Sequence, residues 1–393
     1  QLAADIRWLN ARLHATFDAT RRLSPSEHSA LVMQMRAKHA QYAQAREQLE
    51  RGTLPDQNLG QPLDAFDLAR FRQSAITHLG ADWIALDYYV TDLQVNVVII
   101  THHECTVWQQ PITSALRFAL DTCVHAQRSR RYPTSQDLAT LGQLLLPPTI
   151  WSQLTPDTHL LLAPHRQLHQ VPWAALRIDL SSPTLAEVCI PVGVPSLLSL
   201  HNLWQRPRSS AVSRQHGLLL GVADFGVRRP PLPQVTHEIA ELAQLINGQG
   251  QCMLNAQATW PQLLALRQAT GLQHYAFWHV ASHAFFDSIT GRLSGIALAD
   301  QDMWLDQMRD LAPLPELITL SACSGLQNLM FEGDEAIGLT TTCLAAGARQ
   351  VIGNLWPIRD EAAARLMADV YRHFLTGESA ARALALAQRA AAQ

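Results

Sequence analysis

Two short stretches carry side chains that could do chemistry together. "LITLSACSG" (317–325) places Cys323 at the end of an apolar run, and "HVASHA" (279–284) places His283 in a similar position. A free thiol is only slightly ionised at neutral pH, and a nearby imidazole raises its reactivity. The pair therefore predicts nucleophilic chemistry at a sulfur, provided that the fold brings the two stretches together.

The residues that flank Cys323 are all small: Ser321, Ala322, Ser324 and Gly325. They would let a substrate backbone approach the sulfur and would leave the amide of Cys323 available for an oxyanion hole. A structural interpretation stays open, because free cysteines are among the most buried residues. His279 and His283 would then be ordinary core or surface histidines.

Strand and helix patterns alternate from residue 217 onward and supply the elements that would position these stretches. Strand-like runs occur at 217–224, 251–256, 274–284, 316–323 and 349–356. Helical segments occur at 236–246, 258–269, 333–348, 359–375 and after Gly377. This alternation predicts a parallel sheet with helices on both faces. Strands of such a sheet present chemistry at their carboxyl ends. Adjacent strands would bring His283 and Cys323 side by side, with a spacing of 323 − 283 = 40 residues.

The rest of the chain divides into two further regions. Residues 1–52 read as two helices, which predicts a helical hairpin and linker over residues 1–60. Residues 61–210 alternate helical and β-rich stretches and are expected to form a companion α/β half, and residues 211–393 form the half that carries the two reactive residues. The polar stretch 206–216 separates the two halves. The chain begins at Gln1 rather than Met, so a fragment or processed product is expected.

Composition limits the function classes. Hydrophobic residues make up 48% of the chain and charged residues 16%, which is typical of a globular protein with large cores. The formal net charge of −3 gives no general attraction to nucleic acid or to an anionic membrane. The six cysteines form no C-x-x-C pair, which argues against structural zinc and a disulfide framework and favours a reducing cytoplasm.

Other motifs favour ordinary loops over ligand sites. "THHEC" (101–105) has no second cluster at metal-ligand spacing. The acids of "LADQDMWLD" (298–306) do not follow a calcium-loop pattern. "RSRRYP" (128–133) is a short basic run with little aromatic interleaving, and no phosphate-binding glycine motif follows residues 217–224. His165 and His169 are interpreted as structural.

Several motifs in order resemble the CHAT family, caspase-like domains that often follow TPR repeats and are akin to separases. They are "LLLAPHRQLHQVPWAAL", "GVPSLLSL", "HVASHA", "SGIALAD", "LITLSACSG", the long segment 333–371 and "ALALAQ". The resemblance covers residue 60 to the end. It implies a caspase-like fold, with a pseudo-protease companion half before the catalytic half.

The resemblance also implies a function. It assigns His283 as general base and Cys323 as nucleophile of a cysteine endopeptidase, with the backbone amides of Ala284 and Cys323 in the oxyanion hole and no cofactor. The expected partners are a protein substrate, such as a gasdermin-like pore former in bacterial defence or cell death, and an upstream TPR, sensor or activator. A catalytically inactive, caspase-like scaffold is the alternative.

The sequence departs from the family pattern in three places. Ala284 stands where the family usually has Gly, and a positive φ there would cost roughly 1 kcal/mol or more. The chain stops at Gln393, without the family's further aromatic segment, and TPR repeats are not recognisable.

Acidic residues near the reactive pair suggest a basic P1 preference. Glu335, Asp360 and Trp356 follow Cys323 at offsets similar to those of separase-like sequences, and Asp224 follows the first strand of the catalytic half. A carboxylate would bind an arginine guanidinium with two hydrogen bonds. Asp360 also suits the N-cap of the helix "EAAARLM", so the pocket and capping interpretations both stay open.

Overall fold

The computed structural model describes residues 66–129, 132–207, 212–285, 294–322, 328–330, 336–355 and 358–392, together with a few positions between 24 and 41. The chain separates into two units, Gln1–Ala65 and Phe66–Gln393. In the first unit, the backbone N–H of Ser24 donates to the Glu27 carboxylate and the N–H of Glu27 donates to the Ser24 hydroxyl, which is a capping box. The rest of the expected hairpin lies almost entirely outside the described residues.

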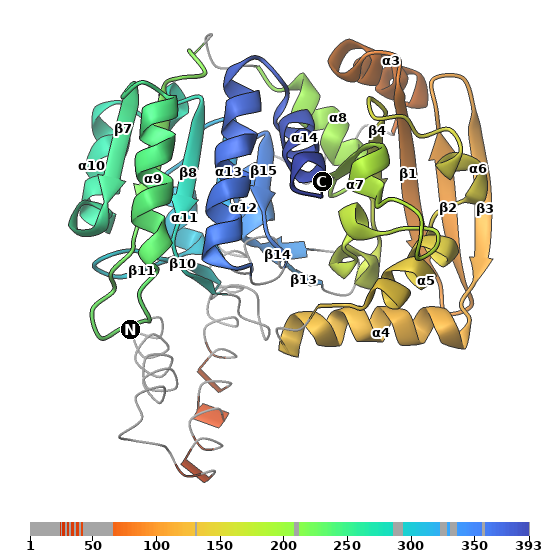
Figure 1. The fold of residues 1–393 in the computed structure, drawn as a ribbon, viewed down its shortest axis with the longest axis horizontal. Coiled ribbons are helices and arrows are strands. Elements are labelled where there is room, and N and C mark those ends of the chain that lie inside the picture. The colour runs from red at the N-terminus through yellow and green to blue at the C-terminus, as the bar shows by residue number, and fades with distance from the viewer. Residues whose placement is uncertain are drawn as a thin grey trace. The chain divides into compact units, whose positions relative to one another are not determined.

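The second unit contains two five-stranded sheets (Figure 1). The first, which we call sheet A, has the order β3-β2-β1-β4-β5. Its strands are β1 (Trp83–Val90), β2 (Gln94–Ile100), β3 (Cys105–Pro111), β4 (His159–Ala163) and β5 (Ile190–Gly193). β1 pairs antiparallel with β2 and parallel with β4.

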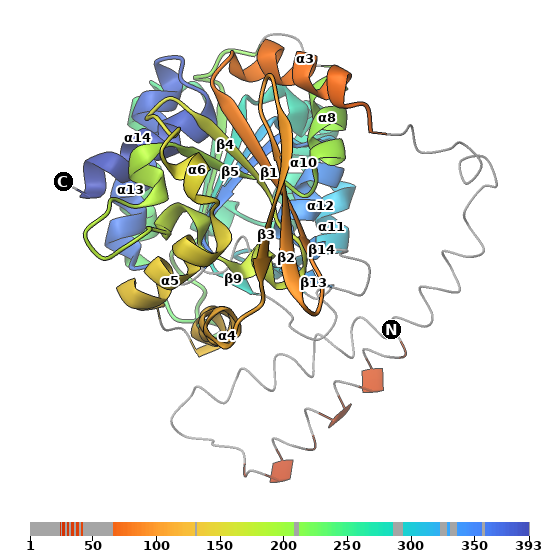
Figure 2. The ribbon, with the colours of Figure 1, turned by 90° about the vertical axis from the view of Figure 1, so that its right-hand side faces the viewer.

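Helices cover both faces of sheet A. One face packs against α3 (Leu68–Leu79) and α8 (Leu197–Gln205). The other packs against α4 (Ser114–Ser129), α5 (Ser135–Leu145), α6 (Pro148–Trp151) and α7 (Leu185–Val188). Figure 2 looks along this half from the β3 edge, with α4, α5 and α6 beside the strands. The 3₁₀ turns η2 (Arg166–Gln170) and η3 (Trp173–Ala175) follow β4.

The second sheet, sheet B, is entirely parallel, with the order β15-β12-β8-β6-β7. Its strands are β6 (Gly217–Gly221), β7 (Gly250–Leu254), β8 (Phe277–Ala281), β12 (Leu317–Ser321) and β15 (Gln350–Gly353). Every residue of β6 and β8 is buried. Strands that are buried along their whole length are typical of parallel sheets that are covered on both faces.

The helices of sheet B also form two layers. α9 (Pro233–Leu245), α13 (Asp360–Leu375) and α14 (Ala380–Ala392) cover one face, in front of the strands in Figure 1. α10 (Trp260–Ala269), α11 (Leu305–Asp310) and α12 (Leu339–Ala345) cover the other. Small strands β9 (Ala284–Phe285), β10 (Gly295–Ala297), β11 (Asp302–Trp304), β13 (Asn328–Met330) and β14 (Ala336–Gly338) and the turns η4 (Asn255–Gln257) and η5 (Leu272–His274) complete this half.

The expected parallel sheet with helices on both faces is confirmed, and three element boundaries differ from expectation. Residues 336–338 form β14, which pairs antiparallel with β13, so the helix expected over 333–348 begins only at Leu339. β8 ends at Ala281, after which the Ser282 hydroxyl bonds the Ala297 carbonyl and turns the chain towards β9. β6 ends at Gly221 rather than Asp224.

Candidate active site

The strands that precede the two reactive residues are neighbours. β8 and β12 pair in parallel, with Ala281 opposite Ser321. His283 lies two residues after Ala281, and Cys323 lies two residues after Ser321. Residues that face each other on the two strands differ by 40 in number, which is also the spacing between His283 and Cys323. Ala322 is buried beside the strand end, whereas Cys323 itself lies outside the described residues. The two strands thus end next to each other, where all strands of sheet B have their carboxyl ends.

The side chain of His283 is held by the loop between β6 and α9. Its Nε2 lies 2.9 Å from the carbonyl oxygen of Pro230, and its ring packs against Phe225 with centroids 4.9 Å apart. A carbonyl oxygen only accepts hydrogen bonds, so Nε2 carries the proton. In the neutral imidazole, Nδ1 then has the lone pair and is the atom that can accept a proton.

Two arginines anchor the loop that carries Pro230. Arg228 donates from Nη2 to the carbonyl oxygen of Leu298 at 2.8 Å. Nη2 of Arg229 lies 2.8 Å from both carboxylate oxygens of Asp302, and the Arg229 guanidinium stacks 4.9 Å from the ring centroid of Phe285. These contacts fix the position of the Pro230 carbonyl and so the orientation of His283.

Ala284, the residue after His283, has ordinary backbone geometry. It lies in β9 opposite Ile296 of β10. Among the described residues other than glycine, a positive φ occurs at Arg166, Asn247 and Asn255 and not at Ala284. The side chain of Ala284 therefore meets no left-handed strain at this position, and its amide keeps the strand geometry.

The candidate specificity residues are only partly described. Asp224 is exposed, and its Oδ1 accepts the N–H of Gly226 at 2.8 Å. It lies three residues beyond the end of β6, where the Asn255 side-chain oxygen accepts the N–H groups of Ala223 and Asp224. Glu335 and Trp356 lie outside the described residues.

Asp360 is the first residue of α13, and Arg359 occupies the N-cap position without a side-chain cap. The capping interpretation places Asp360 at the N-cap, just before the helix. In the structure the helix already begins at Asp360, one residue earlier. Arg359 forms an exposed ion pair with Glu361, with Nη2 and Oε2 3.7 Å apart.

Two features of this half have no clear signal in the sequence. The Pro230 carbonyl is a backbone group, so no residue type marks it. Glu238 of α9 and His279 of β8 are buried together, 3% and 0% exposed, with Oε1 and Nε2 3.1 Å apart but poorly aligned for a hydrogen bond. An acid five residues after the first residue of a helix and a histidine within an apolar strand gave no reason to pair them.

Two of the stretches expected to be ordinary loops contain regular structure where they are described: residues 302–304 of 298–306 form β11, after which α11 begins at Leu305, and residues 128–129 of 128–133 belong to α4. "THHEC" spans the turn between β2 and β3, where the N–H of Thr101 donates to the carbonyl of Glu104. Nδ1 of His165 accepts the N–H of Val90 at 3.0 Å, a structural contact. Within the described ranges no three metal-binding side chains gather, and no helix is long and apolar enough to cross a membrane.

Comparison with known proteins reveals one matching family and a shared fold. A family model described as the CHAT domain matches residues 135–393. No curated protein matches the chain in sequence. A chain of the Saccharomyces cerevisiae separase–securin complex at 3.0 Å superposes with a TM-score of 0.55 and 11% identity, over 81% of this chain and 29% of that one. The present chain thus spans less than a third of that protein.

Two gingipain structures are also similar. The complex of Porphyromonas gingivalis RgpB pro- and mature domains gives a TM-score of 0.37 at 9% identity, over 68% of this chain and 66% of that one. The Arg specific cysteine proteinase gingipain R gives a TM-score of 0.40 at 8% identity, over 65% and 62%. At these identities the superposition with the separase complex shows the fold alone, a caspase-like α/β architecture.

Proposed function

This chain belongs to the CHAT family, and from that premise we propose that it is a cysteine endopeptidase with His283 as general base and Cys323 as nucleophile. The observation that carries the proposal is the register of β8 and β12. Ala281 lies opposite Ser321, so the two strands end side by side, two residues before His283 on one strand and two residues before Cys323 on the other. The hydrogen bond to Pro230 leaves Nδ1 of His283 as the basic atom.

The proposed reaction has two steps. Nδ1 of His283 takes the thiol proton, and the thiolate of Cys323 attacks the scissile carbonyl carbon, while the amides of Cys323 and Ala284 stabilise the oxyanion. The C–N bond breaks, the amine leaves with the proton from His283, and an acyl-enzyme remains. Water, deprotonated by the same imidazole, then hydrolyses the thioester and restores the thiol.

The proposed substrate is one specific protein. A gasdermin-like pore former in a bacterial defence or cell-death pathway is the candidate that the family suggests, with an upstream region or a separate protein as activator. We also propose a basic P1 preference, read by acids among Asp360, Glu335 and Asp224, with Trp356 at the same pocket. The bidentate geometry that a carboxylate offers to arginine supports this preference.

A thiol-directed probe tests the assignment of Cys323. A peptide with Arg at P1 and a thiol-reactive group at its carboxyl end is expected to label the wild-type chain at Cys323, as mapped by mass spectrometry of the digested protein. Cys323→Ala should remove this label and the cleavage activity while retaining the melting temperature, because Ala is small and follows a strand end. A wild-type chain that folds but does not label at Cys323 would instead favour the inactive scaffold.

The other thiols provide an internal control for this labelling. Burial raises the pKa of the thiols of Cys123, Cys189 and Cys343 to about 12. A thiol with a raised pKa stays protonated below that pH, so these three cysteines should remain unlabelled at pH 7–9 in the folded chain. Exposed Cys105 reports non-specific labelling.

A further inference from the structure

Strand β3 is the outermost strand of sheet A, and only one of its two edges is paired within the described part of the chain. It pairs antiparallel with β2, and the strand order places no strand beyond it (Figure 1). None of its seven residues is buried, and Val107 at its centre is 62% exposed. An edge of this kind is a template for a further strand, and proteins usually protect it with charges, a bulge or a cover.

The alternation of the β2–β3 hydrogen bonds shows which backbone groups point outward. At one end the N–H of Thr101 donates to the carbonyl of Glu104, and at the other the N–H of Ile112 donates to the carbonyl of Leu93. In an antiparallel pair every second residue bonds to the neighbouring strand, so the even-numbered residues of β3 bond to β2. The odd-numbered residues direct their backbone groups away from β2, where no other described element bonds to them: Cys105, Val107, Gln109 and Pro111.

As far as the described residues show, β3 lacks the usual protection of an edge strand. It carries no charged side chain from Cys105 to Pro111, and it pairs with β2 one residue to one residue, without a bulge. Its proline stands at the last position of the strand. Pro111 has no N–H, so it removes an outward donor only at the end and sets where an added ladder would stop.

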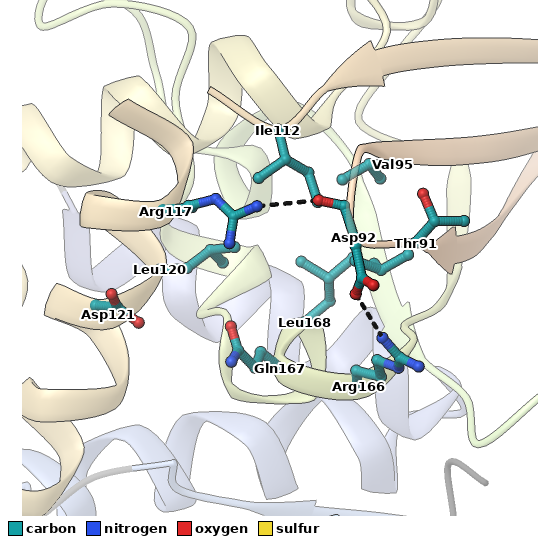
Figure 3. Close-up of a pocket in the computed structure, with 11 residues that line it drawn as sticks. Thr91, Asp92, Val95, Ile112, Arg117, Leu120, Asp121, Arg166, Gln167 and Leu168 are labelled. Atoms are coloured by element: carbon teal, nitrogen blue, oxygen red, sulfur yellow. Dashed lines mark hydrogen bonds and ion pairs between the residues drawn. The ribbon is translucent and has the colours of Figure 1, made fainter. Parts of the chain in front are cut away.

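The segments at both ends of β3 are held in place. Arg72 of α3 donates from Nε to the Thr101 carbonyl at 2.9 Å and from Nη2 to the Glu104 carbonyl at 2.6 Å. At the other end, Nη2 of Arg117 in α4 donates to the backbone carbonyl of Asp92 at 2.9 Å, which ties the β1–β2 turn to the helix that follows β3 (Figure 3). A strand that is already ordered loses little conformational entropy when it pairs.

We propose that β3 pairs antiparallel with β3 of a second copy of this chain, about a two-fold axis at Val107. This axis places Val107 opposite the partner's Val107, and Cys105 opposite the partner's Gln109. Each opposed pair exchanges two backbone hydrogen bonds, so every outward N–H of the strand finds an acceptor. The two copies of sheet A then form one continuous sheet. The proposal does not depend on the proposed protease activity.

The side chains of β3 favour a second copy as the occupant in this register. On the other face of the strand, Thr106 comes opposite the partner's Trp108, and a β-branched residue beside an aromatic one is a favourable cross-strand pair. Glu104, which precedes the strand, comes opposite the partner's uncharged Gln110. Two copies therefore bring no like charges together along β3, and the strand is complementary to itself in backbone and side chains alike.

The size of this contact predicts a reversible dimer. Stable interfaces use roughly 20–30 residues on each side, whereas β3 offers seven. Smaller interfaces are typical of transient association, so we expect a dissociation constant of the order of micromolar. The dimer should thus form and dissociate with the concentration of the chain.

Disulfide trapping in the full chain tests the register. Opposed Cα atoms of a hydrogen-bonded pair lie about 5.5 Å apart, which a disulfide can span. In a Cys105→Ser background, Val107→Cys should give a linked dimer under mild oxidation and Gln109→Cys should not. With the native Cys105 retained, Gln109→Cys should also link two chains, because positions 105 and 109 of one strand are about 14 Å apart and cannot bridge within it.

Non-reducing electrophoresis and mass spectrometry of the linked peptides identify the products of trapping. Any other pattern would overturn the proposal, including equal trapping at positions 107 and 109 in the Cys105→Ser background or none at either. Unchanged melting temperatures of the reduced variants would show that these exposed positions leave the fold intact.

Sedimentation of the native chain across the micromolar range tests the dimer without cross-links. Val107→Lys should weaken self-association roughly tenfold or more, because the axis would place two like charges directly opposite each other. Leu180→Lys is the matched control, since Leu180 lies in the same half outside β3 and is 58% exposed. A native chain that stays monomeric, which would leave the edge to an extended segment of another protein, would overturn the proposal. Equal self-association of the two variants would also overturn it. Because self-association is measured without cleavage, an inactive protease would leave this result intact.

Discussion

His283 illustrates how a backbone group can orient the side chain of a proposed catalytic base. The Pro230 carbonyl accepts the Nε2 proton and sets the tautomer, and Phe225 limits rotation of the ring. In a triad, a carboxylate performs this task and also stabilises the imidazolium by its charge. A neutral carbonyl supplies the orientation and less of the charge stabilisation. The proposed chemistry therefore relies on the intrinsic nucleophilicity of sulfur.

A double-mutant comparison tests whether His283 and Cys323 act as a unit. His283→Ala and Cys323→Ala should each reduce kcat/KM by a similar large factor, and the double variant should be little worse than either, because the effects of cooperating residues are strongly non-additive. Steady-state cleavage of a fluorogenic peptide measures all three. A double variant that is worse by the product of the single effects would contradict the dyad.

The P1 preference is tested at Asp360. If this acid binds a P1 arginine, Asp360→Ala should lower kcat/KM for Arg peptides by roughly a hundredfold and affect peptides with neutral P1 much less. Asp224→Ala tests the other described candidate acid, whose carboxylate accepts the Gly226 amide. A P1 library that selects Leu, Met or Asp would remove Asp360 from the pocket and leave it as the first residue of α13.

At the scale of elements, the parallel sheet was predictable because its signal is local and repeated. The runs that became β6, β8, β12 and β15 are apolar, and helical segments separate them. Their adjacency was an expectation, and the pairing of β8 with β12 confirms it. What the sequence did not reveal depends on contacts between distant residues. β14 was missed because its strand character comes from pairing with β13, and the Pro230 contact links residues 53 positions apart.

Glu238 lies on helix α9 and His279 on strand β8, so their contact joins the helix layer to the sheet. We expect that removing one partner strongly lowers stability. Glu238→Ala should lower the free energy of unfolding by about 3–5 kcal/mol, because removal of one partner leaves a buried polar group uncompensated. Tyr371, whose ring meets His279 edge-on, encloses the same site, and its hydroxyl donates to Thr319. Urea unfolding followed by circular dichroism measures the change.

The matched control for this pair replaces both partners. Glu238→Met with His279→Leu should recover most of the lost stability, because apolar side chains of similar volume avoid the desolvation of the pair. A single Glu238→Ala variant that loses less than about 1 kcal/mol would mean that the pair is not desolvated as its burial indicates. Since α9 follows the loop that carries Pro230, the single variant is also expected to lower kcat.

At the scale of the whole unit, the last helix connects the two sheets. α14 packs its alanines, including Ala383 and Ala387, into the core of sheet B. The same helix contacts α7 and β5 of the sheet A half. The connection between α8 and sheet B adds a second link, because Arg206 donates to the Leu344 carbonyl and accepts from Arg349. A structural change in one half therefore reaches the other through the covalent chain and through these packed contacts.

Arg389 is the residue of α14 on which this connection most depends, and its replacement should weaken the whole unit. The Nε of Arg389 donates to the Ala186 carbonyl at 2.9 Å. Its Nη2 donates to the carbonyls of Pro156 at 2.9 Å and Cys189 at 2.7 Å. Arg389→Met keeps the stem and removes these bonds, so it should cost about 1–3 kcal/mol. Arg382→Met, which removes solvent-accessible pairs with Asp157 and Glu378, should cost less than about 1 kcal/mol. Scanning calorimetry should show one transition at a lower temperature for Arg389→Met. Equal melting of the two variants would show that Arg389 does not couple the halves, and two separate transitions would show that it is required for their cooperative unfolding.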